Sequence, residues 1–147
     1  MKVLPDKTPV VTPEASPDVR EVHFPVGIVG FPEHRRGEIF HLADQLPFQW
    51  LRLHGPDPLH FVVIDPSGLV ADYAPELFDD DAQALGIASG EDAQVYNIVT
   101  VRDGPTTTAT VNLVGPVIMN RHTGIARQVV VANHGQYSAR HPLVTAG

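Results

Sequence analysis

Eight histidines are the first residues in this sequence that suggest chemistry, because imidazole is a common metal ligand and a common general base. No His-x-His pair occurs among them, and no pair of histidines four residues apart accompanies a glutamate. A metal site normally needs such closely spaced ligands. The sequence therefore predicts scattered surface histidines and no metal site. The eight are His23, His34, His41, His54, His60, His122, His134 and His141.

Nucleophilic catalysis has one possible set of residues, the triple Ser138, His141 and Asp65. The residues around Ser138 do not form the Gly-x-Ser-x-Gly turn that exposes a nucleophilic serine. The chain contains no cysteine, which excludes disulfides, thiol catalysis and zinc–thiolate sites. No glycine-rich phosphate loop is present either. We expect neither an enzyme nor a bound cofactor.

Three adjacent carboxylates, Asp79, Asp80 and Asp81, offer acid–base or cation chemistry, although capping of a helix N-terminus explains them more simply. They belong to a strongly acidic middle of the chain. Between Leu53 and Val101 nine acids occur without a single Lys or Arg, and the whole chain has a formal net charge of −7. The nine are Asp57, Asp65, Asp72, Glu76, Asp79, Asp80, Asp81, Glu91 and Asp92.

This charge distribution argues against direct binding to nucleic acid, which requires Lys and Arg to neutralise phosphates. It suits association with a basic partner, since complementary fields speed encounter. Solubility alone explains the charge equally well.

The elements that must position these groups are short strands. Residues 108–120 alternate apolar and polar side chains, as in a strand with one buried face, and Gly115-Pro116 predicts a bend or bulge within it. Ile98–Val101 before it and Ile125–Ala132 after it read as neighbouring strands. Together they predict a meander of three antiparallel strands.

The rest of the chain is punctuated by many of its 14 prolines and 12 glycines, which favours an all-β fold. One helical segment is expected at Pro75–Gly86, as one helix or two short turns, with Gly86 at the position after its end. We predict a mostly all-β, small antiparallel β-barrel-like domain with one or two short helices. Further strands are expected at Val19–Val29 (bent or at an edge), Gly37–Leu42, Pro47–Leu53 and Leu59–Ile64 (central).

Two parts of the chain are distinguished by composition. Residues 1–18 have a proline at every fourth position from Pro5 to Pro17, which predicts a disordered or extended tail, and residues 19–147 form the predicted domain. No apolar run approaches the length of a membrane span, and no signal peptide is evident. With the absence of cysteine, these features lead us to expect a cytoplasmic protein.

Several side chains have two interpretations. Asn112 lies among apolar neighbours, so its amide either pins nearby backbone or faces a groove. Arg140, followed by His141 and Pro142, either ties the C-terminal segment to the barrel through guanidinium hydrogen bonds or forms a contact patch. Phe48 and Trp50 are expected in the core.

An ordered series of motifs between about Arg20 and Leu143 resembles the FliW family of flagellar assembly factors. Pro32, Arg52-Leu53 and Val114-Gly115 depart from the usual residues of that family. The matching motifs include Gly30-Phe31, Pro47-Phe48-Gln49-Trp50-Leu51, Phe61 to Pro66 with Asp65 before Pro66, Tyr73, Ala84 to Gly86, Ile98 to Val101, Ala109 to Leu113, Pro116 to Ile118 with Asn120, Gln128 to Val130, and Tyr137 with Arg140 to Leu143.

The resemblance implies a small β-barrel-like fold and a regulatory role without catalysis. FliW-like proteins bind cytoplasmic flagellin before export and bind the RNA-binding regulator CsrA, whose repression of flagellin translation they block. An acidic flank would face CsrA, and an apolar groove would hold a flagellin terminal helix. The residues expected to contact partners are Asp72, Glu76, Asp79, Asp80, Asp81, Asn112, Asn120, Gln128, Tyr137, Arg140 and His141.

Two other classes stay open from the sequence. One is a cupin-type β-barrel that binds a small ligand or a metal, and the missing His-x-His motif speaks against it. The other is an interaction module with a different protein partner.

Overall fold

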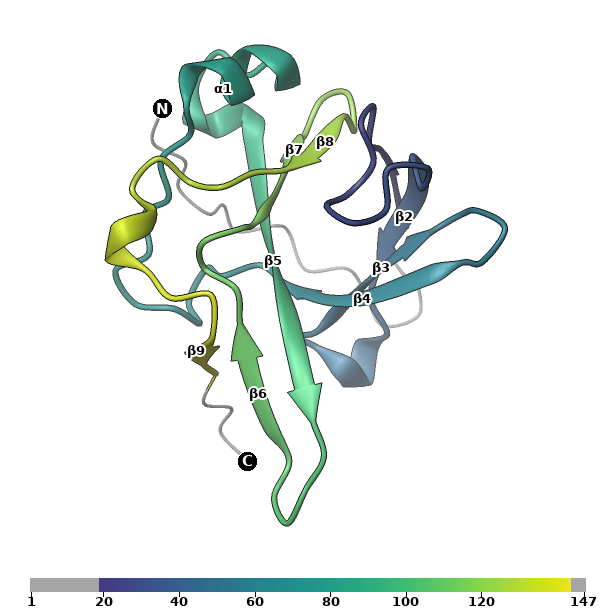
Figure 1. The fold of residues 1–147 in the computed structure, drawn as a ribbon, viewed down its shortest axis with the longest axis vertical. Helices are drawn as coiled ribbons and strands as arrows, with labels where there is room; N and C mark the ends of the chain where they lie inside the picture. Colours follow the sequence, from purple (N-terminus) through teal and green to yellow (C-terminus); the bar gives the residue numbers. More distant parts are fainter. Residues whose placement is uncertain (1–18, 144–147) are drawn as a thin grey trace.

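The computed structural model describes residues 19–143, and the nine strands of this part of the chain form one curled antiparallel sheet (Figure 1). The predicted tail at residues 1–18 lies outside the described residues. The elements are β1 (Arg20–His23), β2 (Arg36–Phe40), η1 (Ala43–Gln45), β3 (Gln49–Leu53), β4 (Leu59–Ile64), α1 (Asp79–Leu85), η2 (Gly90–Asp92), β5 (Ala93–Arg102), β6 (Thr108–Val111), β7 (Val117–Asn120), β8 (Ala126–Gln128), η3 (His134–Gln136) and β9 (His141–Pro142).

The strands follow the order β1-β2-β3-β4-β5-β6-β9, and every neighbouring pair in this path is antiparallel. β1 is at one edge of the sheet and β4 is central, as the sequence predicted. β1 is shorter than the predicted Val19–Val29 strand, because Gly27 and Gly30 adopt positive φ angles of 69° and 88° and turn the chain after Phe24.

On the side away from β4, β5 pairs with two strands in turn along its length. Its C-terminal half pairs with β6, from Val99 opposite Val111 onward, and its N-terminal half pairs with β7, with Val95 opposite Ile118. The buried Gly115-Pro116 bend separates β6 from β7. β8 then pairs with β7, which confirms the predicted meander, although β5 is longer and β8 shorter than expected.

The sheet curls into a half-barrel because its two ends approach each other. His23 at the end of β1 forms an isolated parallel bridge with Ile125, and its backbone N–H donates to the Gly124 carbonyl at 2.9 Å. Gly124 has a φ of 79°, and a Cβ there would lie 2.9 Å from the Glu21 carbonyl oxygen, so glycine permits this approach. The predicted small antiparallel β-barrel-like domain with one or two short helices is confirmed, and α1 is the one α-helix within residues 19–143.

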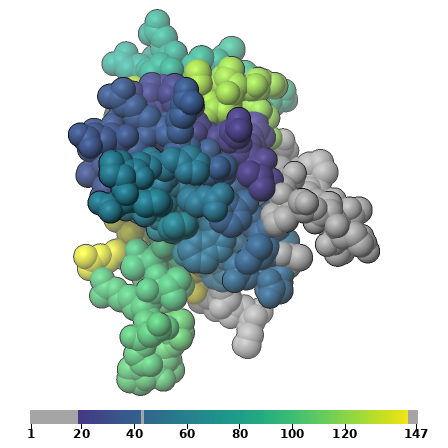
Figure 2. Space-filling view, turned by 90° about the vertical axis from the view of Figure 1, so that its right-hand side faces the viewer, coloured from purple at the N-terminus to yellow at the C-terminus, as the bar shows by residue number. Residues whose placement is uncertain are grey.

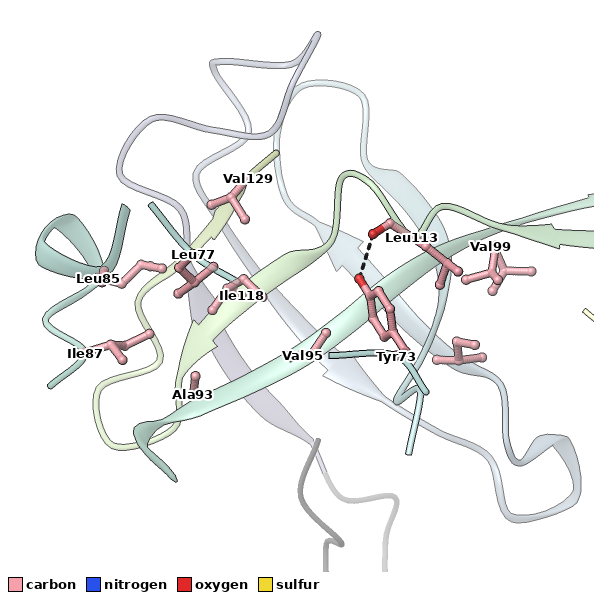
Figure 3. Close-up of a cluster of buried hydrophobic side chains, with 13 residues drawn as sticks. Tyr73, Leu77, Leu85, Ile87, Ala93, Val95, Val99, Leu113, Ile118 and Val129 are labelled. Atoms are coloured by element: carbon pink, nitrogen blue, oxygen red, sulfur yellow. Dashed lines mark hydrogen bonds between the residues drawn. The ribbon is translucent and has the colours of Figure 1, made fainter. Parts of the chain in front are cut away.

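Two apolar clusters lie on the two faces of the sheet. The inner cluster, inside the curl, consists of side chains from β1 to β5, β7, β8 and the loop after β1. The outer cluster joins the sheet to α1 and the loops around it (Figure 3). The inner cluster consists of Val22, Phe24, Ile28, Ile39, Leu51, Leu53, Val63, Tyr96, Val117, Met119 and Ala126. The outer cluster consists of Ile64, Tyr73, Leu77, Ala82, Leu85, Ile87, Ala93, Val95, Val99, Val111, Leu113, Ile118 and Val129.

Strands covered on both faces contribute alternate residues to the two clusters. In β4, Val63 enters the inner cluster and Ile64 the outer one; in β7, Met119 and Ile118 do the same. This double burial explains why the sequences of β4 and β7 are almost continuously apolar. β1 and β2 instead alternate buried with solvent-facing polar residues.

Candidate partner-binding surface

The acidic segment, residues 72–81, leads into the short helix α1. Asp79 and Asp80 are exposed, whereas Ala82 and Leu85 on the opposite side of the helix are buried in the outer cluster. Asp81 is half-buried, and its Oδ1 lies 3.6 Å from Nε of Arg127 on β8. α1 therefore presents two carboxylates that have no ion-pair partner among residues 19–143.

The expected capping by these aspartates is wrong in its detail. Phe78 is the N-cap residue, and no side chain of the described chain caps α1 by a hydrogen bond. All three aspartates lie in the first helical turn, beyond the cap, where their charge acts on the positive end of the helix dipole. At the other end, Gly86 adopts the left-handed conformation, with φ 68°, and donates its N–H to carbonyls of the last turn, as predicted.

The residues before α1 add further charge and one apolar side chain. Asp72 is exposed and has a φ of 59°, and Glu76 is also exposed. Phe78 is 50% exposed between these acids and those of α1. An aromatic ring flanked by carboxylates suits a partner surface that is both basic and partly apolar.

Asn120, one of the predicted contact residues, is only 5% exposed and holds α1 in place. Its Nδ2 donates to the carbonyls of Leu85 (2.9 Å) and Gly86 (3.3 Å), and its Oδ1 accepts from the N–H groups of His122 and Thr123. One side chain thus joins the C-terminus of α1 to the β7–β8 turn.

Two other predicted amides also engage backbone. Asn112 Oδ1 accepts from the N–H groups of Val114 and Gly115, at 3.0 and 2.9 Å, which supports the pinning interpretation. Gln128 Nε2 donates to the Gly115 carbonyl, and its Oε1 accepts from the Val29 N–H. Both side chains brace the bend between β6 and β7.

The C-terminal segment is tied to the sheet by its backbone, and the guanidinium tie, one of the two interpretations of Arg140, is not found among the described residues. Arg140 is exposed, and its guanidinium makes no hydrogen bond or ion pair within the described residues. His141 pairs with Val111 in the β6–β9 ladder, and the Leu143 N–H donates to the Ala109 carbonyl. Strand β9 was missed because two residues show no periodicity.

Tyr137 links this segment to the loop before α1. Its hydroxyl accepts from the Ala74 N–H at 3.0 Å, and its ring meets Tyr73 edge-to-face, with centroids 4.9 Å apart. Tyr73 donates to the Leu113 carbonyl at 2.7 Å, as Figure 3 shows, and accepts from Asn97 Nδ2. Burial raises the pKa of the Tyr73 hydroxyl to about 12, although the bond from Asn97 opposes that rise.

The remaining motif residues have structural contacts. Asp65 accepts from the Ser67 N–H and from Gln94 Nε2, and the buried Pro66 starts the following turn. Trp50 is only half-buried; its Nε1 donates to Gln45 Oε1, while Phe48 packs against the outer cluster. Gly30 and Phe31 lie in the predicted turn, Pro47 follows a cis peptide bond, and the carbonyl of Pro116 accepts from the Val129 N–H.

The residues considered for catalysis or metal binding serve other contacts. Ser138 Oγ accepts from the Arg140 N–H, whereas Asp65 is engaged as described above. Within residues 19–143, no group of three or more His, Asp or Glu side chains is placed to hold a metal ion. In the same part of the chain, no helix has the length and apolar character of a membrane-spanning segment.

An exposed apolar surface lies on the β1–β2 loop, and sequence reasoning missed it. Val26, Val29 and Phe31 are 58%, 75% and 38% exposed, while Ile28 between them is buried. The Ile28–Phe31 bridge and the bond from Val29 to Gln128 fix this loop. Figure 2 views the molecule from the side on which the residues of this loop, in purple and blue, face the viewer. In the sequence, the signal for this apolar surface is the pattern Pro-Val-Gly-Ile-Val-Gly-Phe-Pro, which by itself predicts only a strand and a turn.

These features define a mostly antiparallel β protein, a half-barrel with one short helix and two exposed surfaces of different chemistry. A sequence model of the FliW protein family matches residues 7–143, and the chain belongs to that family.

Known proteins are similar in sequence and in structure over most of the chain. The flagellar assembly factor FliW of Natranaerobius thermophilus is 34% identical over 122 residues, which cover 83% of this chain and 80% of that protein. The FliW of Magnetococcus marinus is 30% identical, over 80% of this chain and 71% of that protein. A crystal structure of the flagellar assembly factor FliW superposes with a TM-score of 0.75, at 32% identity and 86% coverage of both chains.

Proposed function

We propose that this protein is a cytoplasmic flagellar assembly factor that binds flagellin and antagonises the translational regulator CsrA, without catalysing a reaction. The observation that supports the regulator-binding part is the acidic segment, where Asp79 and Asp80 have no ion-pair partner among residues 19–143 and lie on a helix whose other side is buried. A basic RNA-binding protein is the complementary partner for such a surface. Binding both partners would let the level of free flagellin set the amount of CsrA that is blocked.

Eight of the eleven predicted contact residues fall into two groups. Asp72, Glu76, Asp79 and Asp80 are exposed and available to a partner, and we assign the CsrA contact to them. The amides of Asn112, Asn120 and Gln128 bind the chain's own backbone, as does the hydroxyl of Tyr137. Direct partner contact by these eight residues, and by Asp81, Arg140 and His141, stays a prediction.

Charge removal tests the CsrA part of the proposal. We expect the double variant Asp79→Asn/Asp80→Asn to bind CsrA several-fold more weakly and to show a flatter dependence of affinity on salt, because exposed charges act through a screened field. Titration calorimetry at several salt concentrations measures both quantities.

The matched control removes the same amount of charge elsewhere. Glu33→Gln/Asp44→Asn changes two exposed acids outside the acidic segment and should leave the salt dependence close to that of the unaltered protein. Equal effects of the two double variants would show that only net charge matters and would remove the acidic segment from the proposal.

Flagellin binding is the second part, and we assign it to the apolar surface of the β1–β2 loop. Apolar side chains held on a fixed loop suit the apolar face of a terminal helix. Purified protein should retain flagellin in a pull-down, and Val29→Ser/Phe31→Ser should weaken retention while leaving CsrA binding intact. Loss of CsrA binding instead, or no retention of flagellin by the unaltered protein, would contradict this assignment.

A further inference from the structure

The buried amide of Asn120 stands between the sheet and the acidic helix. α1 has only seven residues, and an isolated helix of that length is not stable in water. Its position must come from contacts with the rest of the molecule. The contacts that fix it decide where Asp79 and Asp80 point.

Three contacts dock α1 onto the sheet. Ala82 and Leu85 bury their side chains in the outer cluster, where Figure 3 shows Leu85 beside Leu77. Asp81 pairs with Arg127, whose side chain is 38% exposed. Asn120 donates to the carbonyls of Leu85 and Gly86.

These contacts differ in how strictly they fix direction. Apolar packing tolerates small rotations, and a partly exposed ion pair contributes little. The buried amide of Asn120 is directional at both ends. Its nitrogen donates to the last two carbonyls at the C-terminus of α1, and its oxygen accepts two bonds from the β7–β8 turn. Removing this amide leaves the buried Leu85 carbonyl without its donor, which is costly.

We propose that Asn120 is a positioning residue for the CsrA contact: its carboxamide sets the orientation of α1 and thereby of the Asp79 and Asp80 carboxylates. This inference rests on the proposed function of the acidic segment. It gives a specific role to a residue that the sequence marked only as a contact.

The first experiment compares two asparagines with similar local roles. Asn120→Ala and Asn112→Ala each remove a side chain that accepts two backbone N–H bonds, but only Asn120 also bonds to α1. Asn120→Ala should weaken CsrA binding several-fold and speed hydrogen exchange of the α1 amides. Asn112→Ala should change neither, even if it lowers thermal stability as much.

A double-mutant cycle separates positioning from general damage. In the Asp79→Asn/Asp80→Asn background, Asn120→Ala should have almost no further effect on affinity, because no carboxylates remain to be positioned. The same loss of affinity in both backgrounds would overturn the inference. If the aspartate variants themselves bind CsrA normally, the proposed function fails, and that result is distinct from failure of the inference.

Gly86→Ala provides a route that keeps Asn120 intact, in case Asn120→Ala does not fold. The left-handed φ of 68° at Gly86 strains any side chain, so this variant loosens the same end of α1. Gly86→Ala should weaken CsrA binding in the protein that keeps Asp79 and Asp80. It should have no effect on CsrA binding in the Asp79→Asn/Asp80→Asn variant. Unchanged binding with faster exchange in α1 would contradict the inference.

Discussion

The inner and outer clusters differ in what surrounds them. The inner cluster lies between strands, so backbone ladders satisfy the polar groups of the chain around it. The outer cluster is covered by α1 and irregular loops, which have few ladders of their own. Side chains such as Tyr73, Asn97 and Asn120 therefore supply hydrogen bonds to backbone there. In the sheet, side chains need only to pack well, because the backbone is already hydrogen-bonded in ladders. In the loops, side chains must also donate and accept hydrogen bonds for the backbone.

The largest expected loss of stability comes from a substitution in the inner cluster. Leu51 is fully buried, and Leu51→Ala should lower the free energy of unfolding by about 2–5 kcal/mol, through lost transfer energy and the cavity it leaves. Urea denaturation measures the loss. Leu42→Ala, at a leucine that is 41% exposed, is the control and should cost far less. Similar losses at both positions would mean that the curl does not enclose a tight core.

The next largest effect tests whether the outer cluster depends on hydrogen bonds as well as on packing. Tyr73→Phe keeps the ring in the outer cluster but removes the hydroxyl that bonds to Leu113 and Asn97, and it should cost about 1–3 kcal/mol. Thermal unfolding of the variant gives the value. A neutral result would show that packing alone holds the outer cluster, as in the inner one.

The same hydroxyl gives the outer cluster a dependence on alkaline pH. The pKa of Tyr73 is about 12 in the fold, against 10.0 for a free tyrosine, so its stabilisation is complete below pH 10 and is lost as pH rises toward 12. In Tyr73→Phe this loss should disappear. Unfolding measured between pH 9 and 12 for both proteins checks it, and identical profiles would contradict it.

The smallest expected effect is on the pKa of Asp92, which pairs with His122 near the surface of the molecule. A hydrogen bond from His122 is the main cause that holds the pKa of Asp92 below its ordinary value, and a backbone bond from Ser89 adds to it. The resulting stabilisation is present above the ordinary carboxylate range and is lost as pH falls through the lowered pKa. His122→Ala should raise the pKa of Asp92, which NMR titration of its side chain measures. No change would mean that the backbone hydrogen bonds, those from Ser89 and Ala88, lower the pKa of Asp92 without His122.

The sequence predicted the strands and the end of α1 better than the side-chain contacts of the outer layer. Alternating residues and turn-forming glycines located the meander, the central β4 and the end of α1, because these depend on local periodicity and backbone freedom. The outer layer depends on contacts distant in sequence, such as Asn120 with Leu85 and Tyr137 with Ala74. The sequence marked Asn120, Gln128 and Tyr137 only as contact residues, because nothing in a chain read in order shows which backbone carbonyl or N–H lies opposite a side chain.

The acidic segment followed from composition alone, since charge can be counted without a fold. The apolar surface on the β1–β2 loop did not. The exposure of Val29 depends on Ile28 turning inward, and the turn that separates them is set by tertiary contacts.

β5 is the common partner of three strands, because β4, β6 and β7 each pair with part of its ten residues. The strands β1–β4, the β6–β9 pair and the β7–β8 pair are therefore joined to one another in the sheet through β5. The chain should melt in a single step, and the amide protons at the centre of β5 should exchange only when the entire molecule opens.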